Sequence, residues 1–258
     1  MTDNIITEGE FTYKEAGEGK AIILLHGLMG TASMFDNILE YFANKGYKVL
    51  VPELPIYELP MLKTNVKHFS LLIKRFIEHK NLDRPIIVGN SLGGHIALYL
   101  TKHYPEILSN LVLTGSSGLY ESAMGDSYPK RGDRGYVRKK VEMVFYDPAT
   151  ATEAMVDNLF EVVNDRACLL RVLSLAKSAI RHNMANDLPD MTLETCLVWG
   201  KQDSVTPPEV AHDFNRLMPN SELFWIDKCG HAPMMEHPQE FNDILYSWYV
   251  KRGIIKVD

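Results

Sequence analysis

The chain has 258 residues, of which 46% are hydrophobic and 23% are charged, and its formal net charge is −6. This composition is typical of a globular protein with a sizeable core, and the acidic balance argues against nucleic acid as a partner. The three cysteines, Cys168, Cys196 and Cys229, are too few and too scattered for a disulfide framework. No basic N-terminal start leads into an apolar run, and no apolar stretch approaches the roughly 18 residues of a membrane span. We therefore expect a cytoplasmic protein with no membrane association.

Short apolar runs alternate with amphipathic stretches, which indicates βαβ units and a mainly parallel central sheet flanked by helices. The runs are nearly continuous in apolar residues, as expected for strands that are covered on both faces. The predicted parallel strands are residues 21–25, 47–51, 85–89, 111–114, 195–199 and 222–226. A weaker pair near residues 5–10 and 11–16 is expected to form an antiparallel edge. The predicted helices are residues 33–45, 65–80, 92–103, 208–218 and 238–251.

The interval 115–193 breaks this alternation, because a simple crossover between two strands needs far fewer residues. Its pattern is mostly helical, and Asp147-Pro148 opens one segment. In another segment one helical face is predicted from the spacing of Leu169, Val172, Leu173, Ala176 and Ile180. We expect a helical cap over residues 118–185, inserted into an α/β core formed by residues 1–117 and 186–258.

The sequence Gly89-Asn90-Ser91-Leu92-Gly93 places a serine between two glycines, directly after an apolar run and directly before a helix-like pattern. This context is typical of a nucleophile elbow, in which a strand ends, the chain turns sharply and a helix begins. The serine there takes a strained backbone conformation, and side chains two positions away on either side would collide. The motif is short enough to arise by chance. It indicates a catalytic serine only if the chain also supplies an acid and a base in suitable positions.

A serine hydroxyl needs a base within hydrogen-bond reach, and the base needs a carboxylate that orients it. On this architecture the acid and then the base follow the serine along the chain. Asp203 comes just after the predicted strand 195–199, and His231 comes just after the predicted strand 222–226. All three residues follow strand ends, where an open α/β sheet places its site. We therefore predict Ser91 as the nucleophile, Asp203 as the acid and His231 as the base.

Alternative roles remain open for several of these residues. Asp203 is also suited to cap the turn before Pro207, and His231 is also suited to be a core histidine. Asp227 is a rival acid close to His231 in sequence, although Asp203 has the better position in a loop. His26 is expected to brace its own glycine-containing loop by hydrogen bonding rather than to act as a second base.

A tetrahedral oxyanion needs two backbone donors. The amide of Leu92, at the N-terminus of the helix after the serine, is one candidate. The loop 26–30 follows an earlier strand and has the required glycines, so the Leu28 amide is the second. Residues beside these loops and at the start of the insertion are predicted to line an apolar acyl pocket: Met29, Leu119, Val205 and Met234.

The segments His26-Gly27, Gly89 to Gly93, Gly200-Lys201-Gln202-Asp203 and Gly230-His231 resemble the α/β-hydrolase superfamily, and the similarity covers essentially the whole chain. The resemblance implies an α/β-hydrolase fold with a cap, a catalytic triad of Ser91, Asp203 and His231, and oxyanion donors at Leu28 and Leu92. Serine at the elbow excludes the dehalogenase and epoxide-hydrolase branches, which carry aspartate there.

Within the superfamily, Gly89-Asn90-Ser91 and Cys229-Gly230-His231 are similar to the meta-cleavage-product hydrolases. Those enzymes cleave a carbon–carbon bond in a dienoate and hold its carboxylate with an arginine in the cap. In the corresponding cap helix this chain has Asn158-Leu159-Phe160, without arginine, and Ala232 takes the place of the aromatic residue that usually follows the catalytic histidine.

These features predict a cofactor-free serine hydrolase that cleaves a small to medium apolar ester or related acyl compound through an acyl-enzyme, with no metal. We expect a monomer or a homodimer whose partner is its small-molecule substrate. The alternatives are a carbon–carbon bond hydrolase of the meta-cleavage-product type and a slow ligand sensor on a hydrolase scaffold. Perhydrolysis or halogenation with the same serine is also chemically possible.

Overall fold

The computed structural model describes residues 5–121 and 132–254, and its centre is an eight-stranded sheet with the order β1-β2-β4-β3-β5-β6-β7-β8. Neighbouring strands from β4 to β8 pair in parallel, whereas β2 pairs antiparallel with both β1 and β4. The strands are β1 (Ile5–Glu8), β2 (Phe11–Ala16), β3 (Lys20–Leu25), β4 (Tyr47–Pro52), β5 (Ile86–Asn90), β6 (Asn110–Thr114), β7 (Thr195–Gly200) and β8 (Ser221–Ile226). The predicted mainly parallel sheet with an antiparallel edge is confirmed.

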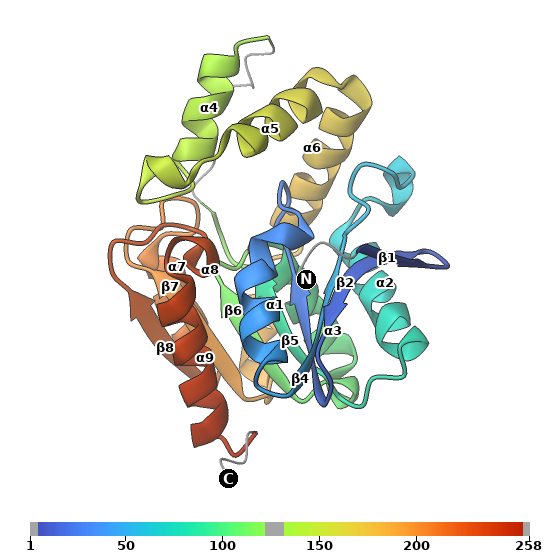
Figure 1. Cartoon of the computed structure of the whole chain (residues 1–258), viewed down its shortest axis with the longest axis vertical. Coiled ribbons are helices and arrows are strands. Elements are labelled where there is room, and N and C mark those ends of the chain that lie inside the picture. The colour runs from blue at the N-terminus through green and yellow to red at the C-terminus, as the bar shows by residue number, and fades with distance from the viewer. Residues whose placement is uncertain (1–4, 122–131, 255–258) are drawn as a thin grey trace.

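Helices cover both faces of the sheet (Figure 1), because each strand sends alternate side chains to opposite faces. Ile23 and Leu25 point into a core shared with α2, α3 and α7, whereas Ile22 and Leu24 point into a core shared with α1 and α9. The helices are α1 (Asp36–Ala43), α2 (Val66–His79), α3 (Leu92–His103), α4 (Arg134–Glu142), α5 (Glu153–Asn164), α6 (Arg166–Arg181), α7 (Pro208–Leu217), α8 (Pro233–Glu236) and α9 (Pro238–Lys251). Short 3-10 turns add η1 (Ala32–Phe35), η2 (Met61–Lys63), η3 (Pro105–Ile107), η4 (Pro148–Thr150) and η5 (Leu188–Asp190). No helix in the described ranges is long and apolar enough to cross a bilayer.

Three helices, α4, α5 and α6, lie between β6 and β7 in the chain and group together beyond one end of the sheet (Figure 1). Each begins with a side-chain cap: Asp133, Thr152 and Asp165 accept hydrogen bonds from backbone N–H groups in the first turns. We call α4 to α6 the helical insertion. Residues 122–131 of the predicted cap lie outside the described residues, so the division into a cap at 118–185 and a core stays a prediction.

The buried face of α6 differs from the prediction. Leu173 and Ile180, which the spacing assigned to the inner face, are 36% and 74% exposed. The helix instead buries Leu175 and Ser178, together with the predicted Leu169 and Val172. The face is rotated because the Ser178 hydroxyl accepts a hydrogen bond from the Val66 N–H at the start of α2, at 3.2 Å. A pattern that counts only apolar residues cannot predict that a polar side chain such as Ser178 lies on the inner face.

The turn from β5 into α3 brings backbone segments unusually close together. A Cβ added at Gly93 would lie 2.1 Å from the carbonyl oxygen of Leu25 at the end of β3. A Cβ added at Gly89 would lie 2.5 Å from the carbonyl carbon of Gly93. Real Cβ atoms do not approach other atoms this closely, so these positions need glycine for lack of space.

We predict that Gly93→Ala lowers the free energy of unfolding by about 1–3 kcal/mol, because the new methyl group must push α3 away from β3. Gly135→Ala is the matched control, since Gly135 is also helical and a Cβ there has its nearest contact at an ordinary 3.4 Å, with Asp133 Oδ1. This control should be neutral or stabilising by up to about 1 kcal/mol. Urea unfolding measures both variants, and wild-type stability of Gly93→Ala would contradict the packing account.

Candidate active site

Ser91 occupies the single position between the end of β5 and the start of α3, with φ of 53° and ψ of −120°. This region of backbone space is rarely occupied by a residue with a side chain, so surrounding contacts must hold it. The Ser91 N–H donates to the Thr114 carbonyl at 3.2 Å, and the Ser91 carbonyl accepts from the N–H groups of His95 and Ser117 at 3.2 and 3.1 Å. The predicted strand–turn–helix at the serine is therefore present.

Asn90 connects this turn to the loop that carries His231. Its buried amide nitrogen donates to the Thr114 carbonyl and to the His231 carbonyl, both at 3.1 Å. The imidazole of His231 lies against Gly115, where an added Cβ would be 2.8 Å from Nδ1. The ends of β5 and β6 and the loop after β8 thus meet at one place, as the strand-end argument predicts.

His231 and Asp203 are in direct contact. The His231 Nδ1 lies 2.9 Å from the Asp203 Oδ2, and both side chains are almost completely buried. Oδ1 of Asp203 also accepts from the N–H groups of Val205 and Thr206 at 2.8 and 2.9 Å, and the Thr206 hydroxyl donates to Oδ2 at 2.7 Å. Asp203 therefore caps the turn before Pro207 and holds the histidine at the same time.

The two groups of this pair shift each other's pKa in opposite directions. Burial alone would raise the pKa of Asp203, but the charge and hydrogen bond of His231, with the Thr206 bonds, lower it overall. Burial alone would lower the pKa of His231, but the charge and hydrogen bond of Asp203 raise it overall. The arrangement favours an ionised carboxylate beside an imidazole that accepts a proton readily. In the described ranges, no hydrogen bond joins Ser91 Oγ to His231 in this conformation.

The rival acid Asp227 lies elsewhere. Its side chain is 61% exposed, 3.7 Å from the Lys201 ammonium, and it accepts a hydrogen bond from the Gln202 side chain at 3.3 Å. The structure thus brings Asp203, and not Asp227, to His231.

His26 braces its loop, as predicted. Its Nδ1 lies 2.9 Å from the Gly27 carbonyl, and its Nε2 lies 3.0 Å from the Leu54 N–H, which can only donate. Glu53 Oε2 also lies 3.4 Å from Nε2. The buried His26 ring therefore fixes the loop after β3 to the loop after β4.

The predicted oxyanion donors, Leu28 and Leu92, both lie close to the serine along the chain or in space: Leu28 follows Gly27, which touches Ser91, and Leu92 follows Ser91 itself. A Cβ added at Gly27 would be 3.1 Å from the Ser91 Cβ and 3.6 Å from its Oγ, so the start of the glycine loop touches the serine. Leu92 opens α3 directly after Ser91. Their role as donors stays a prediction.

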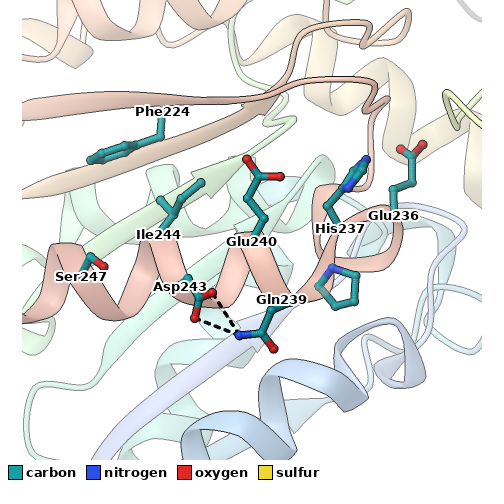
Figure 2. Close-up of a pocket in the computed structure, with 9 residues that line it drawn as sticks. Phe224, Glu236, His237, Gln239, Glu240, Asp243, Ile244 and Ser247 are labelled. Atoms are coloured by element: carbon teal, nitrogen blue, oxygen red, sulfur yellow. Dashed lines mark hydrogen bonds between the residues drawn. The ribbon is translucent and has the colours of Figure 1, made fainter.

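Of the residues predicted to line an acyl pocket, Leu119 and Val205 are 8% and 9% exposed, and Met29 is half-buried. Met234 is fully buried among the residues that pack against α1 and α9. A groove of about 710 Å³ lies instead between β8 and the helices α8 and α9, where Phe224 faces Ile244 (Figure 2). No predicted site residue lines this groove, so the lining of the substrate pocket stays a prediction.

In the described part of the chain, no group of His, Cys, Asp or Glu side chains is arranged to hold a metal ion.

Two contacts within the candidate site were not anticipated from the sequence. Thr206 binds the acid through its hydroxyl, and Asn90 binds the backbone of the histidine loop. The only sequence signal is their position, since Thr206 lies three residues after Asp203 and Asn90 directly precedes Ser91.

Comparison with known proteins agrees with this fold. A protein from Pseudomonas sp named 2-hydroxy-6-oxononadienedioate/2-hydroxy-6-oxononatrienedioate hydrolase is 28% identical, over 95% of each chain. A 2-hydroxy-6-oxo-6-phenylhexa-2,4-dienoate hydrolase from Comamonas testosteroni is 25% identical, over 93% of this chain and 91% of the relative. A crystal structure of an α/β-hydrolase enzyme from a lagoon-sediment metagenome of Mar Chica, Morocco, is 50% identical, with a TM-score of 0.82 over 97% of this chain and 100% of that chain. The model of the alpha/beta hydrolase family matches residues 22–244. The chain therefore belongs to the α/β-hydrolase family.

Proposed function

We propose that this hydrolase cleaves a small or medium apolar ester, or a related acyl compound, with Ser91 as nucleophile, His231 as base and Asp203 as orienting acid. The observation that carries the proposal is the buried 2.9 Å contact between Asp203 Oδ2 and His231 Nδ1, formed beside a serine in a strained turn. Because Nδ1 is held by the acid, Nε2 is the nitrogen left to take the serine proton.

The reaction follows from these positions. Ser91 Oγ attacks the acyl carbon while His231 takes the hydroxyl proton, and the amides of Leu28 and Leu92 stabilise the oxyanion. Collapse of the tetrahedral intermediate breaks the bond to the leaving group, which receives the proton from His231. A water molecule then gives a proton to His231 and attacks the acyl carbon. The bond between this carbon and Ser91 Oγ breaks, the carboxylic acid leaves, and His231 returns the proton to Ser91 Oγ.

A second candidate is hydrolysis of a carbon–carbon bond in a dienoate, which the names of the two relatives favour. Two features of this chain favour an uncharged substrate instead. Leu159 and Phe160, at the place where the resemblance implies an arginine, pack against apolar core residues. Ala232, after His231, is also buried. A substrate carboxylate would have no cation to bind at these positions.

We predict that Ser91→Ala reduces hydrolysis of p-nitrophenyl butyrate by at least about 10⁴-fold, because no other group supplies the nucleophile. Initial rates followed by absorbance of p-nitrophenolate measure this loss. Ser117→Ala is the control, since Ser117 bonds the Ser91 carbonyl through its backbone N–H, which alanine keeps. Undiminished turnover by Ser91→Ala would rule out the assignment.

Activity should fall as the pH falls through the pKa of His231, because only the neutral imidazole accepts the serine proton. Asp203→Asn removes the charge that raises this pKa, so the acidic limb of the pH–rate profile should move to lower pH. The maximal rate should fall about 10³–10⁴-fold, because the imidazole loses the partner that holds its tautomer. An acidic limb at the same pH in both proteins would show that Asp203 does not act on the base.

We expect kcat/KM for p-nitrophenyl butyrate to exceed that for a 2-hydroxy-6-oxo-dienoate, because Leu159 and Phe160 stand where the resemblance implies a carboxylate-binding arginine. Parallel spectrophotometric assays of both substrates decide the ratio. A dienoate rate well above the ester rate would promote the carbon–carbon hydrolase instead. Turnover of neither substrate, with tight binding of one, would favour the ligand sensor.

A further inference from the structure

Glu236 connects two segments that are far apart in the sequence. It is the last residue of α8, and its half-buried side chain leaves the turn before α9 beside His237 (Figure 2). Nothing in the reaction proposed above uses this carboxylate. Its two oxygens nevertheless have separate sets of partners, one on the histidine loop and one on the helical insertion.

The first oxygen holds the segment directly before His231. Oε1 accepts a hydrogen bond from the Gly230 N–H at 2.7 Å, and the Cys229 thiol lies 3.8 Å from it. Burial and the nearby Glu236 charge raise the pKa of the Cys229 thiol, so this group stays a donor. The Glu236 side chain therefore fixes the backbone one residue away from the base.

The second oxygen holds residues 143–147, which connect α4 to η4 and which we call the insertion connection. Oε2 accepts hydrogen bonds from the N–H groups of Tyr146 and Asp147 at 2.7 and 3.4 Å. A charged carboxylate that accepts backbone N–H bonds makes shorter and stronger contacts than a neutral acceptor does. One side chain thus holds both segments in the same place.

The insertion connection also contacts His231 directly, and it contacts Ser204, the residue after Asp203. The His231 N–H donates to the Val144 carbonyl at 2.8 Å, and the Ser204 hydroxyl donates to the Met143 carbonyl at 2.9 Å. The fit is close, because a Cβ added at Gly230 would lie 2.6 Å from the Val144 carbonyl oxygen. A shift of the connection would therefore move the backbone of His231.

We propose that Glu236 is a positioning residue for His231: its carboxylate clamps the histidine loop to the insertion connection and so fixes the base relative to Ser91. This inference rests on the proposed serine chemistry. It implies that the helical insertion supports the catalytic base in addition to any contact it makes with substrate.

Glu236→Gln tests the clamp, because one carboxylate oxygen becomes an NH₂ group that cannot accept. Either Gly230 or the pair Tyr146 and Asp147 then loses its acceptor. We expect the first-order rate constant for labelling of Ser91 by a fluorophosphonate probe to fall about ten- to a hundredfold, since small displacements of a base have effects of this size. Unfolded chains do not react, so the rate constant reports on folded molecules.

The matched control is Glu240→Gln, which removes the same charge from an exposed side chain four residues later, on the wall of the groove (Figure 2). It should label at the wild-type rate. Thermal unfolding of each variant separates the two effects. A Glu236→Gln variant that melts earlier but labels at the wild-type rate would reduce Glu236 to a structural role and overturn the inference.

A conservative variant and a serine variant complete the test. Glu236→Asp keeps the charge but is one methylene shorter, so slower labelling of Ser91 is again expected. If Glu236→Gln does not fold, labelling of Glu236→Asp at the wild-type rate overturns the inference.

Ser91→Ala distinguishes the failure of this inference from the failure of the proposed serine chemistry. Labelling of Ser91→Ala at the wild-type rate would contradict the serine chemistry itself, whereas labelling that needs Ser91 but ignores Glu236 would contradict only the clamp.

Discussion

The site depends on how closely α3 approaches the ends of β3 and β5. A side chain at Gly93 would collide with the Leu25 carbonyl, and one at Gly94 would collide with Ser116, so glycine alone permits the helix to start where it does. The short turn that results leaves Ser91 as the only residue between strand and helix, with a positive φ that the hydrogen bonds to its backbone maintain. Contacts of the neighbouring residues thus hold Ser91 in its strained backbone conformation.

Asp203 and His231 lie near Ser91 because parallel strands end at the same edge of the sheet. The end of β7 and the loop after β8 also lie very close together, since a Cβ at Gly200 would lie 2.1 Å from the Gly230 carbonyl oxygen. The insertion connection then contacts both loops from its own side, through Ser204 and through His231. The helical insertion is therefore bonded to the groups that we propose perform the chemistry.

The sequence predicted the sheet well, and most strand and helix bounds agree within one residue, because continuous apolar runs and helical periodicity are local signals. Ser91, Asp203 and His231 followed from their places after strands. The contacts of Thr206, Asn90 and Glu236 were not predicted, because their partners are side chains or backbone groups brought close by folding. The inner face of α6 was misassigned at Leu173 and Ile180 because a buried serine holds the helix against α2. The short α8 carries too few residues to show any period.

The central claim is that Ser91 carries the acyl group during turnover. Reaction with a chromogenic ester, quenched with acid within the first turnover and followed by peptide mass spectrometry, tests it directly. The account predicts the mass of the acyl group on the peptide that contains Ser91, and loss of this mass as the product acid is released. Rapid turnover with no adduct on Ser91, or with the adduct on another residue, would contradict it.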